Sequence, residues 1–138
     1  MTITRRHLVS ALMLTIGVVH LAPGLVGLST SGLRALYGAA VSDDPTLLTM
    51  LRHRSVLLAL VGAGLVAAVR RPGWCAPALV AAGTSMVSFV ALHLLYRSPE
   101  LTTVAVVDGV ALAALVVVYR HRDLLTPAGR TARDVEVS

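Results

Sequence analysis

The sequence predicts an all-α fold: an antiparallel bundle of four transmembrane helices with both termini in the cytoplasm. Three observations lead to this prediction. First, 56% of the 138 residues are hydrophobic and only 14% are charged, which is too apolar for a soluble domain of this size. Second, four apolar runs are each long enough to cross a bilayer. Third, arginines gather at one set of ends of these runs, as the positive-inside rule requires.

Polar or helix-breaking segments separate the four apolar runs. Asp44 before Pro45 gives the second run a carboxylate N-cap and a proline at its first helical position. The turns at 70–73 and 97–100 are short, so the helices that they join must be antiparallel neighbours. We therefore expect a single transmembrane domain over residues 1–122, with helices at about 8–28, 45–70, 74–96 and 101–119, followed by a polar cytoplasmic tail over 123–138.

Two parts of the N-terminal half allow more than one interpretation. The connection 29–44 is predicted as an interfacial loop with about one helical turn, which would place Arg34 and Tyr37 at the level of the lipid headgroups. Cleavage of the first run as a signal peptide is the less favoured alternative. No small-x-small cleavage site follows it cleanly, and Pro23 would lie awkwardly at the cut.

The net charge of +5 comes from arginines alone, since the chain has no lysine. Most of these arginines lie at the ends of apolar runs, so they indicate membrane topology rather than binding to nucleic acid. The predicted location is the cell (inner or plasma) membrane, with several crossings. Cys75 is the only cysteine, which excludes an intramolecular disulfide and a thiolate metal site, and no cofactor is expected.

Every predicted helix carries an ionisable side chain in its outer half. At ~1.5 Å per residue, Asp108 lies roughly 18 Å and His20 roughly 21 Å above the cytoplasmic boundary. Arg52 lies roughly 27 Å above it, and His93 is comparably high. Such residues are costly inside a membrane and by default indicate a functional site.

The helical pattern also predicts which way the two arginines of the second helix point. Arg52 shares a stripe with the small residues Ser55 and Gly62, so we expect it to face inward. Arg54 shares a stripe with larger apolar residues, so we expect it to face lipid. On this basis Asp108, His20 and Arg52 converge, with His53, His93, Tyr96 and Ser55 as further ligand-binding candidates.

Two functions fit this cluster. In the first, it lines a pocket that binds a lipophilic small molecule or a lipid. Asp108 and His20 could then pass a proton, as in an isomerase or cyclase, although whether any reaction is catalysed is left open. In the second, Asp108 is paired with Arg52 in a non-catalytic membrane subunit, and the cluster only specifies helix packing. A metal is not expected, because no two of His20, His53 and His93 are spaced as a helical metal pair.

Five short segments of the chain form a recognisable pattern. They are Pro23 and Gly24, 33–38 with the letters LRALYG, 51–54 with the letters LRHR, 85–89, and Val107 with Asp108. The pattern resembles small four-helix membrane proteins of high-GC bacteria, which are loosely similar to the DoxX-like membrane proteins. The resemblance covers roughly residues 8–118 and implies a fold rather than a reaction. It leaves open a homo-oligomer or a membrane partner.

The arginine distribution can be tested with topology reporters. A reporter fused after Ser138 should report a cytoplasmic location, and one inserted near Ser42 should report an external one. The measurement is the activity of a reporter that works on only one side of the membrane. An external C-terminus would contradict the predicted orientation.

Overall fold

Four long helices make up most of the molecule. The structure is a computed structural model that describes residues 2–38 and 41–125. These residues contain no strand, so the predicted all-helical fold is confirmed. Each of these four helices is long and apolar enough to cross a membrane. They are α1 (Thr2–Val26), α3 (Pro45–Arg70), α4 (Cys75–Tyr96) and α5 (Thr102–Arg120).

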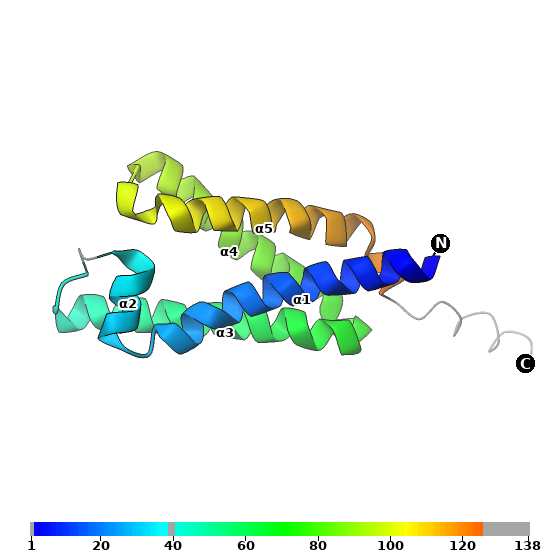
Figure 1. Cartoon of the computed structure of the whole chain (residues 1–138), viewed down its shortest axis with the longest axis horizontal. Helices are drawn as coiled ribbons and strands as arrows, with labels where there is room; N and C mark the ends of the chain where they lie inside the picture. The colour runs from blue at the N-terminus through cyan, green and yellow to red at the C-terminus, as the bar shows by residue number, and fades with distance from the viewer. Residues whose placement is uncertain (1, 39–40, 126–138) are drawn as a thin grey trace, which may run out of the picture.

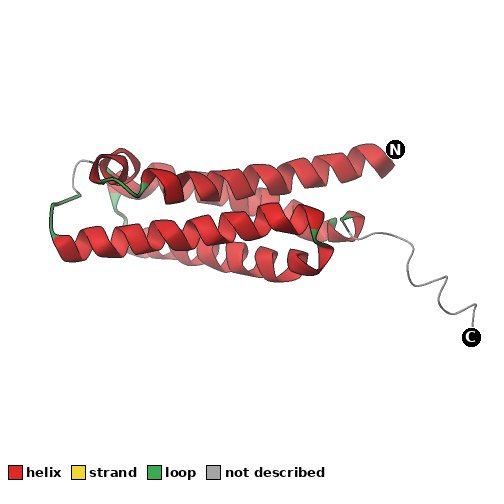
Figure 2. Ribbon diagram, turned by 90° about the horizontal axis from the view of Figure 1, so that it is seen from below, coloured by secondary structure: helices red, strands yellow, loops and turns green. Residues whose placement is uncertain are grey.

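The helices are arranged as two pairs. α1 runs away from the N-terminus and α3 runs back beside it, while α4 and α5 form the second pair (Figure 1). Short loops and single 3-10 turns connect the elements at the ends of the molecule (Figure 2). These turns are η1 (Pro72–Trp74), η2 (Pro99–Leu101) and η3 (Arg122–Leu124).

The main hydrophobic core occupies the half of the bundle that contains the start of α1 and the end of α5. Met13, Leu65 and Met86 are fully buried there, together with Val118. Leu125, just after η3, is also buried in this core, so the chain stays packed beyond the predicted domain end at residue 122. The rest of the predicted tail, 126–138, lies outside the described residues.

α1 and α3 touch through small residues. A Cβ added at Gly24 would collide with the side chain of Ala59, and one added at Gly62 would lie 2.5 Å from the backbone oxygen of Gly17. Real Cβ atoms essentially never come so close, so these glycines allow an approach that no larger residue would permit. Ser55 is fully buried on this seam, where it faces Gly27.

The predicted loop at 29–44 is largely a helix, α2 (Thr30–Tyr37). Ser29 caps it, because its hydroxyl accepts a 3.0 Å hydrogen bond from the backbone N–H of Gly32. Leu33 is fully buried and Tyr37 is 7% exposed, so Tyr37 packs inside the protein, while its predicted headgroup depth stays a prediction. The helical spacing of these two residues lets both pack on α3 in a second, smaller core.

The seam between α1 and α3 predicts a strong difference between two glycines of the same helix. Gly62→Ala should lower the free energy of unfolding by about 1–3 kcal/mol, because the new methyl group meets backbone atoms that cannot move aside. Gly64→Ala is the matched control, since its nearest neighbour would be a methyl group 3.9 Å away. It should be neutral, or stabilising by up to about 1 kcal/mol. Equal melting temperatures of the two variants in detergent would contradict the seam.

Candidate functional site

The two arginines of α3 point in the directions opposite to those predicted. Arg52 is exposed and donates a 3.2 Å hydrogen bond to the hydroxyl of Thr30. Arg54 is half-buried, and its guanidinium lies 4.4 Å from the ring centroid of Phe89 on α4 and 5.3 Å from that of Tyr37 on α2. The predicted inward-facing Arg52 and lipid-facing Arg54 are therefore wrong.

The physical reason is that α3 packs against two neighbours. Its small residues form the seam with α1, and its larger residues form a second inward face. Leu65, on the same stripe as Arg54, is fully buried in the main core. Close-packing motifs identify one helix–helix contact, whereas a helix in the middle of a bundle has a wider buried face.

A cavity of about 310 Å³, here named the Asp108 cavity, lies among α1, α2, α3 and α5. Its wall is mostly aliphatic, with Pro23 and Leu58 among the lining residues. The ionisable side chains on this wall are Asp108, His20, Arg54 and Tyr37. A largely apolar cavity with a few convergent polar groups is the usual form of a site for a small molecule.

His20 is buried on α1, where its imidazole Nδ1 lies 2.9 Å from the backbone oxygen of Ile16. A carbonyl oxygen can only accept a hydrogen bond, so Nδ1 carries the proton of the neutral ring. The other nitrogen, Nε2, then holds the free lone pair. His20 therefore has the tautomer that a general base needs on the wall of the cavity.

Asp108 is half-buried on α5 and makes no hydrogen bond or ion pair within residues 2–38 and 41–125. The predicted pair with Arg52 is therefore wrong, since Arg52 contacts Thr30 instead. The arginine that lines the same cavity as Asp108 is Arg54. Arg54 is thus the arginine of α3 that faces inward toward the Asp108 cavity, as the sequence had suggested for Arg52.

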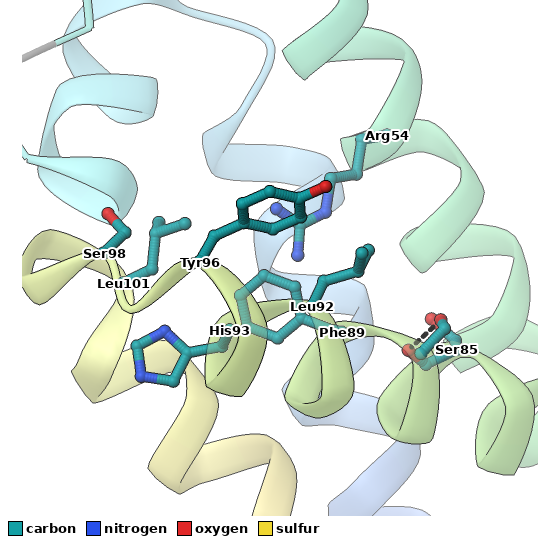
Figure 3. Close-up of a pocket in the computed structure, with 9 residues that line it drawn as sticks. Arg54, Ser85, Phe89, Leu92, His93, Tyr96, Ser98 and Leu101 are labelled. Carbon is teal, nitrogen blue, oxygen red and sulfur yellow. Dashed lines mark hydrogen bonds between the residues drawn. The ribbon is translucent and has the colours of Figure 1, made fainter.

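A second cavity of about 390 Å³, here named the His93 cavity, lies between α3, α4 and η2. Arg54 lines this cavity too. Its side chain reaches from α3 toward α4, where Phe89 and Tyr96 lie (Figure 3). His93 and Tyr96, two of the predicted ligand-binding residues, are on the wall of this cavity rather than beside Asp108.

The other two predicted ligand-binding residues are elsewhere. His53 is exposed and lines neither cavity. Ser55 is fully buried, and its hydroxyl donates a 3.0 Å hydrogen bond to the backbone oxygen of Leu51 on its own helix. Sequence reasoning missed Tyr37 as a cavity residue, although its position four residues after Leu33 indicates that both lie on one helical face.

Comparisons with known proteins were made on the whole chain. No family model matches it, and neither a curated protein nor a solved structure matches it. The resemblance to the DoxX-like membrane proteins therefore stays a prediction from the sequence.

The missing partner of Asp108 leads to a prediction about stability. Asp108→Asn removes the charge at nearly constant shape, so its melting temperature in detergent should equal or exceed that of the wild type. The matched control is Asp43→Asn, which breaks the exposed 2.7 Å ion pair with Arg34. It should lower stability by at most about 1 kcal/mol. A marked destabilisation by Asp108→Asn would mean that the carboxylate is held by a partner.

Proposed function

We propose that this chain is a multi-pass protein of the plasma membrane that binds a lipophilic small molecule or a lipid in the Asp108 cavity. In this proposal the four long helices form an antiparallel transmembrane bundle with both termini in the cytoplasm. Their length and hydropathy support membrane insertion. The arginine distribution supports the orientation, since Arg5, Arg70 and Arg120 lie at one set of helix ends.

With this orientation, both cavities lie in the outer half of the bilayer. The main core fills the cytoplasmic half, where Met13, Leu65 and Val118 are fully buried. The half with α2 contains only the small core around Leu33 and Tyr37. A ligand could therefore enter from the outer leaflet without crossing the tightly packed half.

The observation that carries the proposal is an unpartnered carboxylate on the wall of a cavity. A charged side chain without a partner inside a membrane protein costs ~2.5–3.5 kcal/mol on insertion-type scales, so it is retained where function needs it. The carboxylate of Asp108 and the free Nε2 of His20 line the same cavity, so a bound substrate can pass a proton to and from this pair of groups. Arg54 can bind a carbonyl or an anionic group of the same molecule.

Such an arrangement suits a proton transfer, as in an isomerisation or a cyclisation. The Nε2 of His20 can remove a proton from one atom of the substrate, and the imidazolium that forms can return that proton to a second atom, with the carboxylate of Asp108 on the same wall to stabilise the positive charge. The mostly aliphatic wall would keep water away from the reacting atoms. No redox partner is required, because the number of electrons in the substrate does not change.

The alternative is a non-catalytic membrane subunit whose ionic cluster only specifies helix packing. That function predicts a filled core around Asp108 and a close ion pair. A cavity of about 310 Å³ beside an unpaired Asp108 supports the binding proposal instead. The register of α1 against α3 also has another source, because Gly62 and Gly17 already fix it by close contact.

The proposal can be tested by filling the Asp108 cavity. Ala22 lines it, so Ala22→Phe should expel the ligand. Ala113→Phe is the matched control, since Ala113 is exposed on α5 and lines neither cavity. Untargeted lipid and metabolite analysis of the purified proteins should find a molecule enriched with the wild type and with Ala113→Phe, and depleted at least about tenfold with Ala22→Phe, as the loss of a binding site implies. Equal lipid profiles for all three proteins would contradict the proposal.

The acid–base part has a separate outcome. Asp108→Asn and His20→Asn should still co-purify with the molecule, since most of the contact area is aliphatic. If the site catalyses a proton transfer, wild-type protein should exchange a substrate proton for deuterium in heavy water, and both variants should lose this exchange. Binding without exchange in the wild type would make the protein a carrier or a sensor.

A further inference from the structure

The His93 cavity shares Arg54 with the Asp108 cavity but differs from it in charge. No acidic side chain lines the His93 cavity, whereas Asp108 lies on the wall of the other one. The exposed carboxylate of Glu100 accepts a 2.9 Å hydrogen bond from the hydroxyl of Ser98, which lines the cavity. An anionic group next to Arg54 would thus avoid the like charge of Asp108 by lying in the His93 cavity.

The geometry around Arg54 leaves its hydrogen-bond donors available. Phe89 and Tyr37 contact the guanidinium through their ring faces. The N–H groups of a guanidinium point outward in its own plane, so stacked rings hold the charge in place without using these donors. Arg54 makes no hydrogen bond or ion pair within residues 2–38 and 41–125. Its planar fork matches the oxygen atoms of a carboxylate or a phosphate.

Polar side chains other than that of Arg54 also line the His93 cavity. The Nδ1 atom of His93 is buried and has no hydrogen-bond partner in the described part of the chain. This atom is sealed from solvent, so His93 lines the cavity through its other atoms. The hydroxyl of Ser85 also lines the cavity, while that of Ser88 is used in a 2.9 Å bond to the backbone oxygen of Ser85 (Figure 3).

We propose that the His93 cavity is the subsite for an anionic headgroup, so that the ligand of this protein is an anionic amphiphile with a carboxylate or a phosphate. The headgroup binds the guanidinium of Arg54, and Ser85 lines the same cavity. The apolar part of the same molecule then occupies the Asp108 cavity on the other side of the Arg54 contact. This inference rests on the proposed function, because it names the class of molecule that the Asp108 cavity takes.

The test compares a charged and a neutral form of one amphiphile. The full-length protein is reconstituted in phosphatidylcholine bilayers with spin-labelled stearic acid or its methyl ester, at a pH that ionises the acid. Electron paramagnetic resonance then gives the fraction of each probe that the protein immobilises. The wild type should prefer the acid by about tenfold or more, as a charge-assisted hydrogen bond to a guanidinium implies. Spin-labelled phosphatidic acid should behave like stearic acid.

Three variants separate the subsite from a general effect of charge. Arg54→Gln should lose the preference for the acid, while Arg52→Gln, which removes the same charge from an exposed position of the same helix, should keep it. Ser85→Leu fills the cavity from α4 and leaves Arg54 in place, so it too should lose the preference. This variant keeps the test decisive where Arg54→Gln does not fold. An equal preference in all variants would overturn the inference.

The outcomes also distinguish this inference from the function that it extends. Equal immobilisation of the acid and the ester by the wild type would overturn the anionic subsite and leave the lipophilic Asp108 cavity intact. Immobilisation of neither probe beyond ordinary boundary lipid would contradict the proposed function itself. Inorganic phosphate, added as a competitor, should displace the acid only weakly, because it lacks the apolar chain. Complete displacement by inorganic phosphate would overturn the assignment to an amphiphile.

Discussion

The close contact between α1 and α3 is the constraint on which the rest of the structure depends. Gly24 and Gly62 let the two backbones approach so closely that a single added methyl group would collide with the opposite helix. Such a contact has only one register, because every other alignment places a larger side chain against a backbone. It therefore fixes the rotation of α3 about its axis, and with it the directions of Arg52 and Arg54. The charge of Arg54 faces the cavities because Ser55, one residue later, faces α1.

The cavities exist because the two helix pairs are not packed equally along their length. At one end, Leu65, Met86 and Val118 fill the space between the pairs. At the other end, α2 and the aromatic rings around Arg54 occupy part of the space, and the Asp108 and His93 cavities, of about 310 and 390 Å³, lie there. Tyr37 and Phe89 connect α2 and α4 to α3 through the same guanidinium. A ligand that binds Arg54 would thus affect the contact that joins α2, α3 and α4.

The sequence was sufficient for the helices but not for their rotation. Hydropathy and the Asp44–Pro45 start predict α3 at the residues where the structure has it. A strong N-cap fixes the first residue of the helix, and the long apolar run that follows fixes its length. The sequence also brought His20 and Asp108 to one depth, and the structure places both on one cavity. It failed at Arg52 and Arg54 because the burial of α3 is set by two neighbours, and a stripe of small residues marks only one of them. It underestimated α2, whose stability comes largely from packing Leu33 against α3 rather than from local propensity.

The position of Asp108 bears on whether the polar cluster serves packing or ligand binding. A charged pair that specifies packing must be in contact, since only a short-range interaction discriminates one register from the next. Asp108 has no such contact in the described part of the chain, and the seam of Gly17 and Gly62 already provides the discrimination by steric means. The carboxylate therefore adds a desolvation cost without a visible structural gain. A cost of this kind on the wall of a cavity, together with a histidine on the same wall, therefore favours the binding proposal over a role in packing alone.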